Sequence, residues 1–210
     1  FSMTLPTLTI HESNMQFGPY PAERCFHVEQ SRGYQALQDG VKMVEFFLLR
    51  EQQFGQVLWA IEAKSSSPRA ENSTKLEQFI TEICQKFHNA LFLLLAARLG
   101  RQPSIHAELS QQYQDLDLQH LGLRLALIIH GHQKSWLPPV QDRLRQTLKP
   151  LIKTWGLSPQ SVLVPGPPHS DDIQWKSRKS AQNLSKPYGA DSPKNGFDCS
   201  KLNKYHSKLS

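Results

Sequence analysis

Three charged residues, Glu45, Glu62 and Lys64, stand within two of the most apolar stretches of the chain, residues 41–49 and 56–64. Charged side chains are costly to bury unless they are paired with opposite charges or hold a metal ion. Carboxylate oxygens are ligands that Mg²⁺ and Mn²⁺ prefer, and a lysine beside them can orient a water molecule or contact a phosphate. The residue types therefore predict metal-dependent hydrolysis of phosphodiester bonds.

The two apolar stretches, 41–49 and 56–64, are separated by a polar segment and predict the paired strands of a β-hairpin. Side chains alternate along a strand, so Glu62 and Lys64 should point to the same face. A hairpin that turns around residues 50–55 should bring the carboxylates of Glu45 and Glu62 together across the strand pair. The hairpin is therefore the element that must position the three charges.

The backbone carbonyl of Ala63 lies between the two charged side chains at the end of the second strand. We expect it to complete a metal site in which Glu45 and Glu62 supply the carboxylate ligands. Mg²⁺, or Mn²⁺ in its place, is the expected ion. In the alternative interpretation, Glu45, Glu62 and Lys64 form a cross-strand ion pair on an exposed face and bind no metal.

Around the hairpin, the pattern predicts an α/β protein with a central mixed β-sheet flanked by helices. Hydrophobic spacing predicts a long helix from about Thr74 to Gly100, and a near-continuous apolar run predicts a central strand. A second helix should be ended or kinked by Pro150. The complete expectation is a strand at 7–10, a short helix before 37, strands at 41–49 and 56–64, a helix at 74–100, a polar surface crossing at 101–119, a strand at 123–129, a helix at 136–155 and a strand at 161–165.

An acidic residue on one strand, Glu-x-Lys at the end of the next, and then a helix, a strand and a helix resemble the PD-(D/E)XK nuclease superfamily. The resemblance covers about residues 41–165 and implies a restriction-endonuclease-like core. It implies that Glu45 and Glu62 are metal ligands and that Lys64 orients the attacking water. The first acid in this family is usually Asp, whereas this chain has Glu45, and Asp39 is a rival in the preceding turn.

Two further residues are possible auxiliary members of the site. By the same resemblance, Glu29 matches an acid that some family members carry on a preceding helix. Lys86, on the long predicted helix, is either a phosphate contact or an ordinary solvated lysine. His130 and His132 follow the central strand as His-Gly-His and are either metal ligands or surface histidines.

The chain has a net charge of +6, and residues 170–210 carry eight Lys or Arg against four Asp, so they account for +4 of it. This composition predicts residues 1–165 as one nuclease-like domain and residues 166–210 as a flexible, disordered basic tail. A nucleic-acid-binding module led by this tail is a third possible function.

DNA is the expected partner, as a substrate within a host-defence or DNA-processing assembly. The alternative is a catalytically inactive subunit of the same fold, which uses the apolar long helix to bind a protein partner or a second copy as a homodimer. No apolar run is long enough for a membrane helix, so no membrane partner is expected. Three scattered cysteines and the lack of an export signal predict a cytoplasmic protein.

Overall fold

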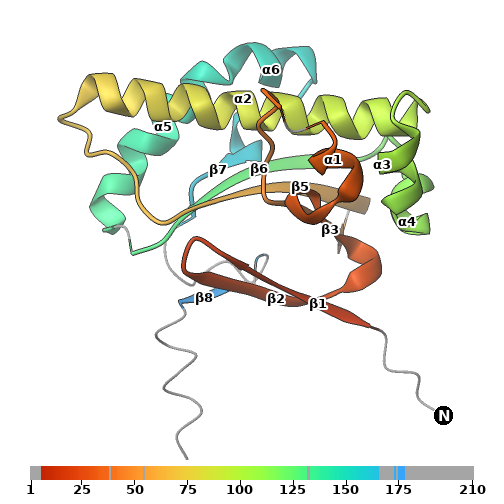
Figure 1. The fold of residues 1–210 in the computed structure, drawn as a ribbon. Coiled ribbons are helices and arrows are strands. Elements are labelled where there is room, and N and C mark those ends of the chain that lie inside the picture. Colours follow the sequence, from red (N-terminus) through yellow and green to blue (C-terminus); the bar gives the residue numbers. More distant parts are fainter. Residues whose placement is uncertain are drawn as a thin grey trace, which may run out of the picture.

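A computed structural model of the chain describes residues 6–37, 39–53, 55–131, 133–165, 173 and 175–177. The fold is α/β, as the sequence predicts. Figure 1 shows three layers: a group of helices, a five-stranded mixed sheet, and a smaller three-stranded sheet on the opposite face. Each face of the large sheet is covered, which explains why its strands are apolar on both sides.

The five-stranded sheet is the centre of the molecule. Its order is β3-β4-β5-β6-β7, where β4 is antiparallel to β3 and β5, and β5, β6 and β7 are parallel. The hairpin pairs Phe46 with Ile61 and continues to Gln52 and Gly55. The strand bounds are β3 Cys25–His27, β4 Phe46–Gln52, β5 Gly55–Lys64, β6 Gly122–Ile129 and β7 Val162–Leu163.

Helices cover one face of this sheet, and α2 (Ser73–Arg98) runs along it. Apolar residues from α2 recur every three or four positions and pack against Phe47, Leu49 and Leu58 of the hairpin. The predicted helix at 136–155 is broken into α5 and α6 just before Pro150, which confirms the expected interruption. The other helix bounds are α1 Arg32–Gln35, α3 Pro103–Glu108, α4 Gln111–Gln114, α5 Leu137–Thr147 and α6 Lys149–Thr154.

The small sheet covers the other face and has the order β1-β2-β8. It consists of β1 (Thr7–Glu12), β2 (Met15–Pro21) and β8 (Trp175–Ser177). Ser13 and Asn14 have positive φ angles of 48° and 63°, which fit a two-residue hairpin turn between β1 and β2. The inward residues of this sheet pack against Phe46, Trp59, Ile61 and Ala63 in a second hydrophobic core.

Part of the segment predicted to be a flexible tail belongs to the fold. Strand β8 pairs antiparallel with β2, and Ile173 is buried in the second core. The boundary at residue 165 is therefore too early, because the wide spacing of apolar residues concealed a short strand completing a sheet begun near the N-terminus. The remaining residues of the predicted tail lie outside the described part of the chain.

The first strand of the hairpin begins later than predicted, at Phe46 instead of Val41. In this segment, side chains supply hydrogen bonds to backbone carbonyls that a neighbouring strand would otherwise supply. The Tyr34 hydroxyl donates to the carbonyl of Val41 at 2.8 Å, and Asn89 Nδ2 donates to the carbonyl of Lys42 at 2.8 Å. The turn is also shorter than the predicted 50–55, because ladder pairing continues to Gln52 and Gly55.

The prediction of a polar surface crossing at 101–119 is wrong. This segment contains α3 and α4, and it buries Ile105, Leu109, Tyr113 and Leu116 in the main core. These apolar residues are too widely spaced in sequence for a periodic signal. Among the described residues, the structure contains no helix with the length and apolarity that a membrane span requires.

Candidate active site

The end of the hairpin brings Glu45, Glu62 and Lys64 together. Glu45 directly precedes β4, and its amide donates to the carbonyl of Ile61 at 3.1 Å, which fixes it beside the end of β5. Lys64 Nζ lies 3.1 Å from Glu62 Oε1, as expected for side chains on the same face of a strand. All three residues lie at the carboxyl edge of β5, where the amide of His130, just after β6, donates to the carbonyl of Lys64.

Lys86 reaches into this site from the middle of α2. Its Nζ lies 2.8 Å from Glu62 Oε1 and 3.9 Å from Glu45 Oε1, so one ammonium group contacts both carboxylates. Lys86 is only 7% exposed. The interpretation of Lys86 as a solvated helix lysine is therefore wrong.

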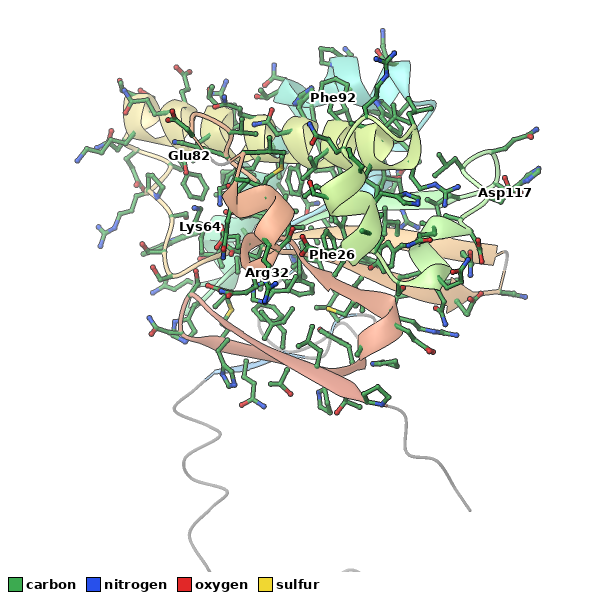
Figure 2. All side chains as sticks on the ribbon, turned by 45° about the vertical axis from the view of Figure 1, so that its right-hand side comes forward. Phe26, Arg32, Lys64, Glu82, Phe92 and Asp117 are labelled. Carbon is green, nitrogen blue, oxygen red and sulfur yellow. The ribbon has the colours of Figure 1, made fainter. Side chains whose placement is uncertain are left out.

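A more exposed set of charges continues the site toward solvent. Glu82, one helical turn before Lys86 on α2, lies 3.6 Å from Lys64 Nζ through Oε1 and 3.5 Å from Lys42 Nζ through Oε2. Figure 2 shows Lys64 and Glu82 at the same end of the molecule, far from Asp117 at the other end. Lys64 therefore bridges a buried carboxylate and a partly exposed one.

The two central carboxylates are deeply buried and incompletely paired. Glu62 is 0% exposed and Glu45 is 6% exposed. Oε2 of each residue has no hydrogen-bond partner within the described residues. Buried polar atoms are normally hydrogen-bonded, so two such oxygens in one site favour a ligand over a purely structural role.

Glu45 also belongs to a second group of acids, which we call the outer cluster: Glu12, Glu29 and Glu45. One carboxylate oxygen from each lies within 4.8 Å of the others. Glu12 comes from the end of β1, and Glu29 comes from a single 3-10 turn, Val28–Gln30. The amide of Val28 donates to the Glu45 carbonyl at 3.1 Å, which holds this turn beside the hairpin.

The tip of the β1–β2 hairpin contacts the end of β5. Ser13 Oγ donates a hydrogen bond to the carbonyl of Ala63 at 3.0 Å, and His27 Nε2 lies 3.6 Å from Glu12 Oε1. The Ala63 carbonyl is the backbone group that the sequence predicts as a metal ligand. A carbonyl oxygen has two lone pairs, so the bond from Ser13 leaves one for another contact.

Burial and like charges together set the ionisation of this site. Burial raises the pKa of Glu45, and Glu62 and Glu29 raise it further, to about 9, although Lys86 opposes them. Burial also raises the pKa of Glu62 against the opposing effect of Lys86 and Lys64. Burial alone would lower the pKa of Lys86, but Glu62 and Glu45 outweigh it and leave that pKa raised.

The sum of the connected charges fits a divalent cation. Five carboxylates share the site with three lysine ammonium groups, and burial lowers the pKa of His27, which favours its neutral form. The carboxylates are Glu12, Glu29, Glu45, Glu62 and Glu82, and the lysines are Lys42, Lys64 and Lys86. The oxygen donors and the two unpaired buried oxygens suit Mg²⁺ or Mn²⁺. Binding of the ion would displace the proton that the raised pKa of Glu45 keeps in the metal-free protein, and with all five carboxylates ionised the group has two excess negative charges. The residues present therefore fit the expected ion.

The raised pKa of Glu45 predicts that the metal-free protein becomes less stable as pH rises. Between its ordinary value near 4.5 and about 9, the folded state keeps a proton that the unfolded state releases. The free energy of unfolding should therefore fall with increasing pH, by up to about 1.4 kcal/mol per pH unit for one proton. Urea unfolding at pH 5.5, 7.0 and 8.5 with a chelator present measures this slope.

The matched variant is Glu45→Gln, which keeps the shape of the side chain and cannot titrate. Its free energy of unfolding should depend less steeply on pH than that of the wild type. Glu62 retains a raised pKa and keeps part of the slope. An identical slope in the two proteins, or a wild type that gains stability with pH, would contradict the ionisation state assigned to Glu45.

Other sequence candidates lie outside this arrangement. Asp39 is exposed in the turn before the hairpin and forms none of the described contacts. Of the two rival acids, Glu45 is therefore the one that lies with Glu62 and Lys64. The amide of His130 lies at the same edge as Lys64, but His132 is outside the described residues. The proposed histidine pair therefore remains a prediction.

Sequence reasoning missed Glu12 and Glu82. A two-residue polar turn, Ser13-Asn14, between two alternating stretches is a hairpin signal that would have extended β1 to Glu12. Glu82 stands four residues before Lys86 on a long helix, which is the spacing at which side chains share a face. Neither signal says that these side chains reach the hairpin site.

The fold and the site define an α/β protein with a buried carboxylate and lysine cluster at the edge of a mixed sheet. Comparisons of this chain with protein-family models, with curated proteins and with solved structures find no match. The functional argument is therefore carried by the geometry of the site.

Proposed function

We propose that this protein is a metal-dependent nuclease that hydrolyses DNA phosphodiester bonds. The observation that carries the proposal is the convergence of Glu45, Glu62 and Lys64 at one strand edge, with both carboxylates buried. A structural ion pair on an exposed face would not need burial, and it would not leave Oε2 of each carboxylate unpaired. This burial argues against the cross-strand ion pair as the sole role of the three residues.

In this proposal, Glu45, Glu62 and the carbonyl of Ala63 hold Mg²⁺ or Mn²⁺. A divalent cation bound there polarises a phosphoryl oxygen and offsets the charge that develops on the phosphate. Lys64, with its side chain 26% exposed, can reach both Glu62 and solvent. Its ammonium group orients the attacking water and contacts the scissile phosphate. Lys86 keeps Glu62 in position from the buried side.

The element order supports a restriction-endonuclease-like core as the finer description of the fold. The first acid directly precedes β4, Glu62 and Lys64 end β5, and α2, β6 and α5 follow in that order. Apart from α3 and α4, which lie between α2 and β6, and the position of Glu45 one residue before its strand, this is the succession on which the resemblance to PD-(D/E)XK nucleases rests. A role for the protein in host defence or DNA processing is part of the same proposal.

One observation favours the alternative, an inactive subunit that binds a protein partner. Phe92 on α2 is 59% exposed, and Figure 2 shows it on the outer side of that helix. At the end of α2 away from the site, a cavity of about 420 Å³ is lined mainly by leucines and by Trp155. These apolar surfaces fit a protein contact and need no metal.

The test is cleavage of plasmid and single-stranded DNA by the purified wild type with Mg²⁺ or Mn²⁺. We expect cleavage that stops when a chelator is added and returns when excess Mn²⁺ is supplied. A folded wild type that cleaves neither substrate with either ion would contradict the nuclease proposal and favour the inactive subunit. Circular dichroism of the same preparation establishes that the protein is folded.

A further inference from the structure

Two segments meet beside the strand edge that carries the proposed active site. Arg69 lies between the end of β5 and the start of α2, and Trp136 lies in the short helical turn Lys134–Trp136, between β6 and α5. Figure 1 shows the first turns of α2 and α5 at the same end of the large sheet. Ligands of α/β sheets bind outside the carboxyl ends of the parallel strands, and both segments lie there.

Arg69 forms a stack with Trp136 in this region. Its Cζ lies 5.3 Å from the centroid of the indole ring, within the distance of about 6 Å at which a cation is attracted to an aromatic face. Arg69 is exposed and Trp136 is partly buried, so the guanidinium lies on the solvent side of the stack. Within the described part of the chain, no carboxylate pairs with Arg69. The stack therefore restricts the guanidinium and leaves its outer side to solvent.

A shallow hollow of about 440 Å³ adjoins the stack. It is lined by Arg69, Glu71, Asn72 and Ser73, so one positive and one negative side chain face it. Glu71 would repel a phosphate placed in this hollow. An uncharged nucleobase suits it better, because a base stacks on a guanidinium plane and forms hydrogen bonds with carboxylate and amide side chains.

The hollow is close to the residue that we propose to contact the scissile phosphate. Arg69 follows Lys64 by only five positions, so the two lie within about 18 Å even if the intervening chain is fully extended. A strand with its phosphate at Lys64 therefore reaches Arg69 within a few nucleotides. Bases in a duplex are already paired and stacked, whereas an unpaired base is able to turn toward such a platform.

We infer that Arg69, stacked on Trp136, is a platform for an unpaired base and that the substrate of the proposed nuclease is single-stranded DNA. This inference rests on the proposed function and names its substrate class. Trp136 holds the plane of the guanidinium, and the base stacks on the outer face of that plane. Every base has a π-face, so the platform selects unpaired strands without selecting a sequence.

The test is binding of fluorescein-labelled DNA to the full chain, measured by fluorescence anisotropy with Ca²⁺ in place of Mg²⁺. The probes are a mixed-sequence single strand and the same strand paired with its complement, and electrophoresis of the recovered DNA establishes that it is uncut. The variant Arg69→Lys keeps the charge and removes the planar group. Its matched control is Arg101→Lys, an exposed position just beyond the opposite end of α2.

We expect Arg69→Lys to weaken binding of the single strand by at least about 5-fold, the loss expected when one stacking contact is removed. Its duplex binding and the salt dependence of its affinity should not change, because the charge is kept. Arg101→Lys should bind both probes like the wild type. Trp136→Leu, which removes the ring beneath Arg69, should weaken single-strand binding as Arg69→Lys does, and thermal unfolding establishes that each variant is folded.

Contrary results separate this inference from the proposed function. Unchanged single-strand binding by Arg69→Lys, equal losses for the two probes, or a wild type that binds only duplex would overturn the platform. A loss in Arg69→Lys with none in folded Trp136→Leu would assign the effect to hydrogen bonds of the guanidinium and overturn stacking. Cleavage by the wild type decides the proposed function independently. A wild type that binds single strands through Arg69 and cleaves no DNA would support the platform and contradict the nuclease.

Discussion

Replacing Lys64 with alanine should lower the rate of DNA cleavage by about 100- to 10,000-fold, the range in which a positioned proton-transfer or water-orienting group contributes. Lys64 is the partly exposed cation of the site, and its Nζ contacts Glu62 Oε1 at 3.1 Å. The fold should change little, because Lys86 still pairs with Glu62 at 2.8 Å. Single-turnover cleavage with saturating Mn²⁺ measures the loss, and thermal unfolding measures stability.

The control for this variant is Lys153→Ala, which removes an exposed lysine on α6 and should cleave like the wild type. This control measures how much cleavage falls when the protein loses one positive charge that could contribute to DNA binding. Full cleavage by Lys64→Ala would remove Lys64 from the mechanism. A loss of the same size in both variants would assign the effect to DNA binding.

The largest change in stability should follow from Lys86→Met. This variant keeps an unbranched side chain on α2 and removes the ammonium group that contacts the fully buried Glu62. Breaking a buried ion pair by removing one partner typically lowers the free energy of unfolding by about 3–5 kcal/mol. Lys64 Nζ, at 3.1 Å from the same oxygen of Glu62, remains and should keep the loss toward the lower end of this range. Urea unfolding at pH 7 in the presence of a chelator measures it.

A second substitution separates charge from packing. Glu62→Met combined with Lys86→Met removes both partners of the pair, and it should recover most of the stability lost in Lys86→Met alone. If the double variant is as unstable as the single one, the loss comes from packing of the lysine stem and not from an unpaired carboxylate. If Lys86→Met unfolds like the wild type, the ion pair contributes no net stability.

The hairpin part of the site follows from short-range rules. Alternation along β5 places Glu62 and Lys64 on one face, and strand pairing brings Glu45 to the same edge, as the sequence predicts. These relations hold because they depend on the period of a strand and on a turn a few residues away. Whether the site binds a metal or cleaves DNA stays a prediction.

The rest of the site depends on contacts between remote segments. Glu12 reaches the hairpin because β1 and β2 pack on the face opposite α2, and nothing in its local sequence specifies that face. The burial of Lys86 is equally invisible in a helix pattern, because a lysine at the border of an apolar stripe can point either way. Its direction is set by the two carboxylates beneath it.

The small sheet joins the beginning and the end of the described chain. Strand β2 lies between β1 and β8, and β8 comes from residues 175–177, more than 150 positions after β2. During synthesis, the edge of β2 stays unpaired until those residues have left the ribosome. The β1–β2 hairpin, which carries Glu12 and Ser13, pairs with β8 only after that point. Completion of the small sheet that covers the β4–β5 hairpin is thus tied to the synthesis of residues 175–177, so a nascent chain would carry an unpaired β2 edge until late in its synthesis.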